Sequence, residues 1–193
     1  MTVTILALLG ASALWGMRAG WRHRAERTGA VVPSLPAVPA DDDPALGRAL
    51  TAPIEATYVS STVAGDWLER VVAHDLGVRS GAVVQVFTGG VRVRRHGAAD
   101  LWVPAGALLA AGTAPGMAGK YVGGDGLVVL TWQPPSSGAT ADAPSDATAD
   151  RAPAARLDTG LRPRRAEDRA ALLRAARDLA AAATTTIPTE ETA

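Results

Sequence analysis

Three histidines are the side chains best suited to general-base or zinc chemistry, and their surroundings decide whether they perform it. His23, His74 and His96 are the only histidines of the 193 residues, and the chain has no cysteine. No two of them have the i, i+4 spacing of a helical zinc site. His74 and Asp75 are adjacent, so they point in different directions on a helix, and Ser80 lies in no G-x-S-x-G motif. We therefore expect no metal site and no hydrolase triad.

The segment APGMAGKY, residues 114–121, is the stretch most similar to a phosphate-binding loop. In such a loop, glycine amides and a lysine hold the phosphate, and a following Ser or Thr binds magnesium. Here Ala114 replaces the first glycine, and Tyr121 follows Lys120 in place of the hydroxyl residue. We predict a turn between two strands instead. We expect no enzyme activity, no catalytic residue and no cofactor.

Residues 62–81, TVAGDWLERVVAHDLGVRSG, combine aromatic, acidic, basic and imidazole side chains in a short segment. Asp66 and Glu69 form a capping-box pattern and Gly77 offers a left-handed stop, which together predict a helix over residues 67–76. Helical spacing places five apolar side chains toward one side, namely Trp67, Leu68, Val71, Val72 and Leu76. The favoured interpretation is a plug that closes one end of a barrel, with Trp67 buried.

An exposed docking surface is the alternative interpretation of the same segment. In that case the candidate partner-binding residues are Trp67, Arg70, His74 and Arg79. Specific phosphoinositide binding is not expected, because the two arginines stand beside three acidic residues, and phosphates need several convergent cations. Nucleic-acid binding is not expected either, since 19 basic and 19 acidic residues balance over the whole chain.

Residues 1–21 are predicted to form a transmembrane anchor. Positions 3–21 are almost wholly apolar and span about 28 Å as a helix, close to the roughly 30 Å of a bilayer core. Arg22, Arg24 and Arg27 follow this run, which predicts a single-pass cell-membrane protein with its N-terminus outside and its C-terminal domain cytoplasmic. A cleaved signal peptide is the alternative, but its basic residues would precede the apolar run.

The remaining chain divides into a linker, a domain and a tail. Residues 22–53 begin with a basic collar and continue as a proline-rich stretch, which predicts a semi-rigid spacer. Residues 54–183 carry the domain. Within it, the Pro/Ser/Ala/Asp composition of residues 134–154 predicts a disordered insertion, and residues 184–193 are expected to be a disordered tail.

The domain shows short strand patterns followed by one amphipathic helical pattern. Strands are expected at residues 54–61, 80–87, 91–95, 100–104, 127–132 and 156–163, and a helix at 164–183. Residues 91–94 alternate Val and Arg, which predicts one buried and one wet face, whereas the unbroken apolar run LVVLTW predicts a central strand. This order predicts an α+β, mainly β fold: a curled antiparallel sheet whose open end is covered by a C-terminal amphipathic helix. It resembles the PH-like barrel, which implies about seven antiparallel strands followed by that helix.

Four stretches resemble the membrane-anchored PH-like domain proteins of actinobacteria: AGDWLERVVAHDLGVRSG, VRVRRHGAADLWVPAGAL, GMAGK and GLVVLTW. Members of that family are often encoded among pyrimidine-biosynthesis genes and are labelled membrane or export proteins. The resemblance implies a PH-like fold at a membrane. The expected function is a membrane-anchored adaptor that binds an unknown protein partner at the cytoplasmic membrane face and contacts lipid through its anchor. An accessory subunit of a transporter or export system is the alternative.

Overall fold

A computed structural model describes residues 10, 15–16, 32, 34–121, 123–124, 126–135 and 155–185. The predicted basic collar lies outside the described residues, and so do most of the predicted anchor, insertion and tail. Among the described residues, no helix combines the length and the apolar character that a membrane crossing requires.

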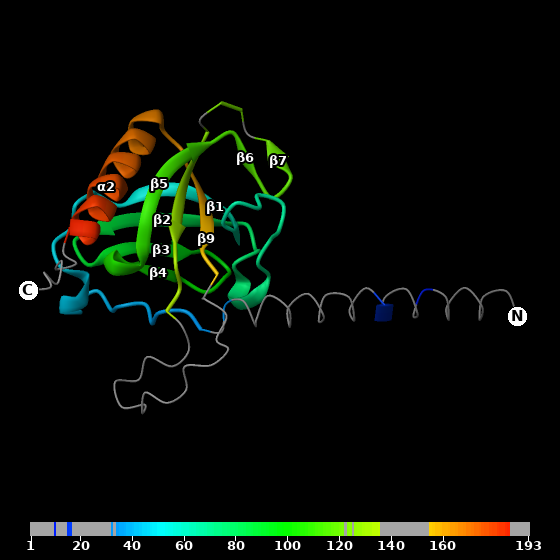
Figure 1. Cartoon of the computed structure of the whole chain (residues 1–193), viewed down its shortest axis with the longest axis horizontal. Coiled ribbons are helices and arrows are strands. Elements are labelled where there is room, and N and C mark those ends of the chain that lie inside the picture. Colours follow the sequence, from blue (N-terminus) through cyan, green and yellow to red (C-terminus); the bar gives the residue numbers. More distant parts are fainter. Residues whose placement is uncertain are drawn as a thin grey trace, which may run out of the picture.

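Seven strands form one antiparallel sheet that curls into a half-barrel (Figure 1). Its order is β4-β3-β2-β1-β9-β8-β5. The strands are β1 (Ile54–Val63), β2 (Ser80–Phe87), β3 (Gly90–Arg95), β4 (Leu101–Pro104), β5 (Leu108–Ala114), β8 (Leu127–Trp132) and β9 (Leu157–Pro163). Register shifts in β1, between Tyr58 and Ser60, and in β5, between Leu108 and Ala110, help the sheet to bend. The predicted strands are confirmed, with LVVLTW as an inner strand between β5 and β9.

Short elements complete the chain between these strands. They are the hairpin strands β6 (Gly116–Met117) and β7 (Lys120–Tyr121) and the 3-10 turns η1 (Pro44–Leu46), η2 (Ala73–Asp75) and η3 (Ala105–Ala107). The β6–β7 turn falls within the segment that resembles a phosphate loop, so the predicted turn between strands is confirmed.

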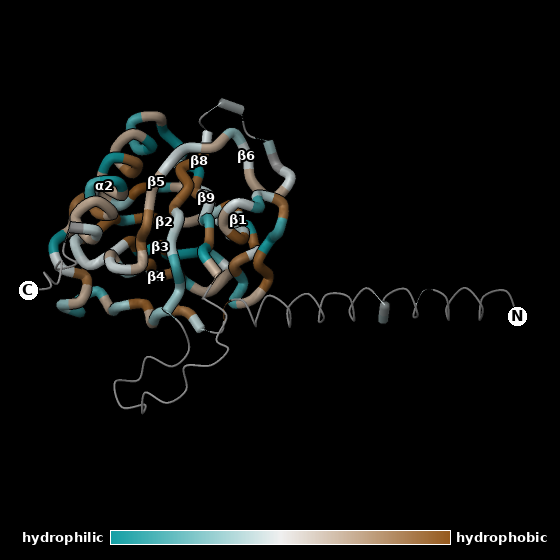
Figure 2. The backbone as a smooth tube through the Cα atoms, in the orientation of Figure 1, coloured by the Kyte–Doolittle hydropathy of each residue, from teal (hydrophilic) through white to brown (hydrophobic). Residues whose placement is uncertain are grey.

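The helix α2 (Ala166–Thr185) packs on the half-barrel and contacts β5, η3, β8, β2 and β9. In Figure 2 it alternates between hydrophilic and hydrophobic stretches, as an amphipathic helix must. Its inward side chains Leu172, Ala176, Leu179 and Ala180 are buried in the main core. The predicted C-terminal amphipathic helix is therefore confirmed.

The proline-rich stretch before β1 packs on the sheet, so the spacer interpretation is wrong for residues 41–51. Leu46 is 4% exposed and forms a separate apolar cluster with Phe87 and Trp102. The backbone amides of Leu50 and Thr51 donate to the Val86 carbonyl at 2.8 and 3.3 Å. Proline at this density excludes a helix but leaves the side chains between the prolines free to pack.

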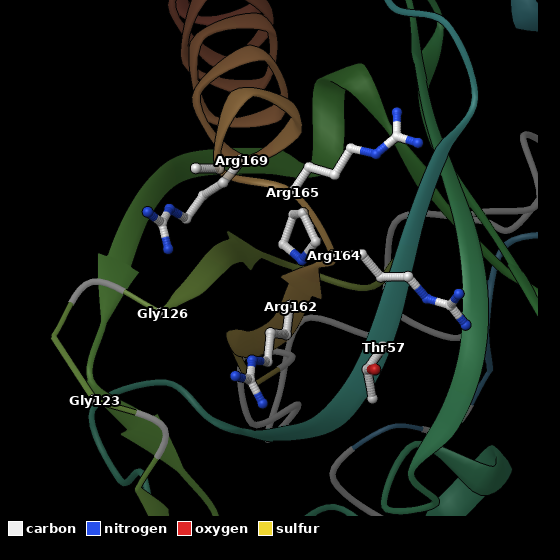
Figure 3. Close-up of a pocket in the computed structure, with 9 residues that line it drawn as sticks. Thr57, Gly123, Gly126, Arg162, Arg164, Arg165 and Arg169 are labelled. Carbon is white, nitrogen blue, oxygen red and sulfur yellow. The ribbon is translucent and has the colours of Figure 1, made fainter.

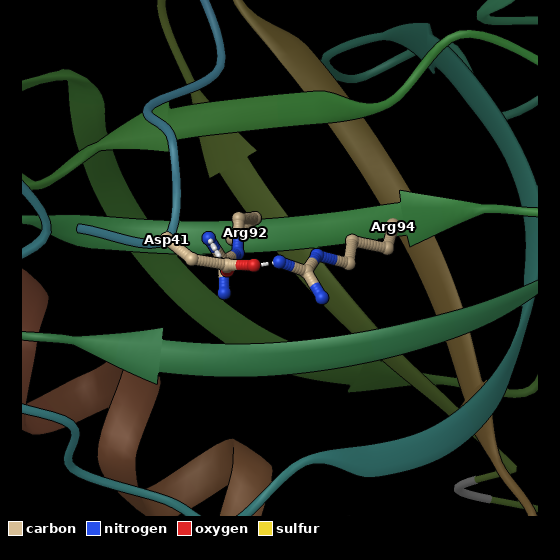
Figure 4. Close-up of polar contacts among 3 residues, drawn as sticks. All are labelled: Asp41, Arg92 and Arg94. Carbon is tan, nitrogen blue, oxygen red and sulfur yellow. Dashed lines mark hydrogen bonds and ion pairs between the residues drawn. The ribbon is translucent and has the colours of Figure 1, made fainter. Parts of the chain in front are cut away.

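Asp41 joins this stretch to β3 (Figure 4). Its carboxylate lies 2.9 Å from a guanidinium nitrogen of Arg92 and also contacts Arg94. The Arg92 side chain is 7% exposed, and its guanidinium carbon lies 5.0 Å from the centre of the Phe87 ring. The expected wet face of β3 is therefore covered at Arg92, because residues 41–51 lie over it.

Candidate functional site

The candidate site is the connector, which we define as residues 64–79 between β1 and β2. It contains turns and the short η2, so the predicted helix over 67–76 is wrong. The second half of β1 extends beyond its pairing with β2, and its backbone groups need other partners. The connector supplies them: the Ser61 amide donates to the Leu76 carbonyl at 2.7 Å, and the Val71 amide donates to the Ser61 carbonyl at 3.0 Å. These long-range bonds replace the bonds within a helix.

Two local predictions for the connector have different outcomes. Asp66 does accept from backbone amides, those of Leu68 and Glu69 at 2.9 and 3.1 Å, but the turn does not continue as a helix. Gly77 is not left-handed; His74 and Asp75 are, with φ of 55° and 58°. Glycine is instead needed at position 77 because a larger residue would be too close to its neighbours: a Cβ there would lie 2.9 Å from the Val71 carbonyl oxygen.

A buried chain of hydrogen bonds runs from β8 to the connector. Trp132 Nε1 donates to Thr159 Oγ1 at 2.9 Å, and Tyr58 Oη donates to the Leu76 carbonyl at 2.8 Å. Between them, Thr159 and Ser61 hydroxyls are 2.7 Å apart, and Ser61 and Tyr58 hydroxyls are 2.8 Å apart. Each hydroxyl has one proton, so Ser61 donates to Tyr58 and Thr159 donates to Ser61. Burial raises the pKa of Tyr58 to about 12, which keeps this donor neutral.

Arg95, only 6% exposed, holds the other side of the connector. Its guanidinium lies 4.0 Å from the centre of the Tyr58 ring. It donates to the carbonyls of Asp75 at 2.8 Å, Val78 at 2.9 Å and Ala99 at 3.2 Å. Charge-assisted bonds from a buried arginine are strong, so Arg95 fixes the connector backbone at Asp75 and Val78.

The outer surface of the connector carries two large apolar side chains. Trp67 is 57% exposed and Leu68 is 61% exposed. The plug interpretation is therefore wrong for these residues, although Val71 and Leu76 are buried as it predicted. Because the segment folds back on β1 instead of forming a helix, the expected apolar side is divided between the core and the surface.

A family model described as bacterial PH domain-like matches residues 32–177. That span covers more than half of the chain, from the stretch that packs on β3 to α2, and it agrees with the curled sheet and C-terminal helix described above. The chain belongs to the bacterial PH domain-like family. No curated protein matches it. The predicted PH-like fold is confirmed, whereas the actinobacterial lineage, the anchor and the gene neighbourhood stay predictions.

The PH-like domain brings two of the four predicted partner-binding residues together. The Trp67 carbonyl accepts from the Ala118 amide at 2.7 Å, and Arg70 donates to the Ala118 carbonyl at 3.3 Å, so both adjoin the β6–β7 turn. His74 lies elsewhere, with Nε2 2.8 Å from the Val32 carbonyl oxygen. Arg79 is exposed near the start of β2. Leu68 was missed as an exposed candidate, because the helical pattern assigned it to the core.

The other candidate chemistry in the PH-like domain has local partners. Ser80 Oγ lies 3.4 Å from Arg95 Nε, and His74 contacts a backbone carbonyl, so the described contacts do not join them into a triad. Within the described ranges, no group of three His, Asp or Glu side chains could hold a metal ion.

Proposed function

We propose that the chain is an interaction module that binds a protein partner through Trp67 and Leu68, without catalytic activity of its own. The observation that carries the proposal is an aromatic and an aliphatic side chain, each more than half exposed, on a connector that is hydrogen-bonded to β1 and to the β6–β7 turn. Aromatic anchors dominate many protein interfaces, and a rigid backbone loses little entropy on binding.

The charges around this surface favour a protein over a phosphorylated lipid or a nucleic acid. Arg70 already donates to the Ala118 carbonyl, and the connector also contains Asp66, Glu69 and Asp75. A polar rim of mixed sign around an apolar centre is common in protein interfaces. Phosphate recognition instead needs several cations that point at one place.

We further propose that this module works at the cytoplasmic face of the cell membrane, anchored in lipid through residues 1–21. The supporting contact is that of His74 with Val32, because it places the connector beside the point where the chain arrives from the predicted collar. Protease added to intact cells should leave the PH-like domain uncut. Digestion from outside would contradict this placement.

A photo-crosslinking amino acid at position 67 of the full-length chain tests the proposed surface directly. We expect one discrete protein adduct in cells, which weakens when Leu68→Ser is added. The same amino acid at Leu109, which is 41% exposed on β5, is the matched control and should give no such adduct. Equal adducts from both positions, or adducts with lipid alone, would contradict the proposal.

The captured protein also separates the expected adaptor function from its alternative. A soluble protein supports the adaptor function, because it would be recruited to the membrane by this chain. A multi-span membrane protein supports the alternative of an accessory subunit of a transporter or export system, since one predicted helix cannot form a pore by itself.

A further inference from the structure

We propose that an arginine-lined pocket at the junction of β9 and α2 binds the phosphate group of a small molecule or of a lipid headgroup. The pocket has a volume of about 500 Å³. Four arginines line it, namely Arg162, Arg164, Arg165 and Arg169, together with Thr57 of β1 and the glycines at 123 and 126 before β8. No carboxylate is among the described residues that line it.

The four arginines divide into two pairs by direction (Figure 3). Arg162, near the end of β9, and Arg169, in α2, extend toward the side where Gly123 and Gly126 lie, whereas Arg164 and Arg165 extend toward the other side. Arg162 and Arg169 could therefore hold one phosphate between them, with one guanidinium from the sheet and one from the helix. The second pair adds positive charge to the same junction.

These guanidinium groups are not engaged by carboxylates in the described part of the chain. The ion pairs found there join Asp41 to Arg92 and Arg94. Of the nearby acids, Asp168 lines a separate cleft beside residues 50–54, and Glu167 lines neither cavity. Asp125, between the rim glycines, lies outside the described residues.

A phosphate fits the two guanidinium groups of Arg162 and Arg169, which extend to the same side and pair with no carboxylate in the described part of the chain. The planar guanidinium matches two phosphate oxygens at once, and a doubly charged anion relieves the repulsion among neighbouring cations. The first-turn amides of the twenty-residue α2 add a smaller positive potential at the same place. A volume of about 500 Å³ exceeds that of phosphate alone, so the ligand carries an organic group as well.

The pocket and the connector lie at opposite ends of the same strand pair. Val63, where β1 meets the connector, pairs with Leu157 at the start of β9. Thr57, which lines the pocket, pairs with Arg162 near the end of β9. The phosphate site is thus separate from the proposed partner surface, and failure of one does not imply failure of the other.

The test is calorimetric titration of the purified full-length protein with inorganic pyrophosphate at physiological salt. Arg162→Gln with Arg169→Gln should weaken binding at least about tenfold, because each lost arginine removes charge-assisted hydrogen bonds. Arg162→Lys should weaken it less. The control Arg174→Gln removes an identical charge from another part of α2, which does not line this pocket, and should leave binding within about twofold of the parent.

Vesicles distinguish the two sources of phosphate. Competition with pyrophosphate by phosphatidic acid vesicles, but not by phosphatidylcholine vesicles, indicates a lipid headgroup; failure of both vesicles to compete indicates a soluble ligand. Thermal melts should show that the double variant folds like the parent, because Arg162 is exposed and Arg169 is only half-buried. The proposal is overturned if neither pyrophosphate nor phosphatidic acid binds, or if the double variant and Arg174→Gln behave alike.

Discussion

Tyr58 is the residue that connects the core of the barrel to the connector. Burial is the largest influence on its hydroxyl and raises the pKa to about 12, while the hydrogen bond with Ser61 and the charge of Arg95 act in the opposite direction. The neutral hydroxyl donates to the Leu76 carbonyl, and the ring lies under the Arg95 guanidinium. Loss of the Tyr58 proton would therefore leave a buried anion and break the bond to the connector.

This pKa predicts a loss of stability in alkali. An unfolded tyrosine ionises at about pH 10, whereas folded Tyr58 stays neutral until about 12. The unfolded state loses its proton first, so this contribution is complete below pH 10 and disappears as the pH rises to 12. The decrease in the free energy of unfolding should reach about 3 kcal/mol at most.

Urea denaturation of the parent and of Tyr58→Phe across this pH range measures the effect. The variant should be less stable by about 1 to 3 kcal/mol at neutral pH, because the Leu76 carbonyl loses one of its two donors and the buried Ser61 hydroxyl loses its acceptor. The free energy of unfolding of the variant should also decline less steeply above pH 10 than that of the parent. Tyr121 is 79% exposed and remains in both proteins, so it contributes equally. Parallel slopes would contradict the buried, neutral role of Tyr58.

Single residues of the candidate site were only partly predictable. Trp67 and Arg70 stood out from the sequence because few surface segments combine such side chains, and the structure brings them together at Ala118. The burial of Trp67 was predicted wrongly, since apolar spacing alone does not specify which local structure the segment adopts. The arginines of LRPRRAEDR were assigned to a strand end and a helix, although four within eight residues were a signal of a charged site.

Among the elements, the stretch before β1 changes most between prediction and structure. Leu46 packs with Phe87 and Trp102, and the Ala45 amide donates to Asp43 at the start of η1. The family match also begins at residue 32, before this stretch. The folded unit therefore includes residues that composition alone assigned to a spacer.

Leu46→Ala tests whether this stretch stabilises the sheet. We expect the free energy of unfolding to fall by about 2 to 5 kcal/mol, as for other buried leucines. Asp41→Asn should cost less, about 1 kcal/mol, because the Asp41 side chain is 72% exposed and asparagine keeps an acceptor for Arg92. Chemical denaturation of the full-length variants provides both values. A Leu46→Ala protein as stable as the parent would show that the contact does not hold in solution.

The strands were predictable because their signals are local. Apolar runs bounded by glycine turns predicted six of the seven strands of the main sheet, and β5 is the one that was not assigned. The absence of a helix over residues 67–76 was not predictable in the same way. The connector backbone instead bonds to backbone groups of Ser61 and Val63 on β1, beyond the part of β1 that pairs with β2. Such bonds depend on strand lengths that the local pattern does not contain. The insertion and most of the anchor lie outside the described residues.

In the described part of the molecule, the curled sheet and α2 present two separate surfaces. The hydrogen-bond chain from Trp132 to Leu76 fixes the apolar surface at one end of β1 and β9. The arginine pocket lies at the other end, where β9 leads into α2. An adaptor with this arrangement would bind a protein at the connector while a phosphate occupied the pocket, without overlap between the two.

The most direct measurement compares Trp67→Ala with Trp132→Ala in the full-length protein, by thermal melting and by co-purification of the partner that the crosslinking experiment identifies. Trp132 is fully buried and bonded to Thr159, so its loss should cost about 3 to 5 kcal/mol and lower the melting temperature strongly. Trp67→Ala should cost less than about 1 kcal/mol, as expected at the surface, yet abolish partner retention. A Trp67→Ala protein that melts far below the parent, or that keeps its partner, would contradict the account of the connector as a rigid, exposed docking surface.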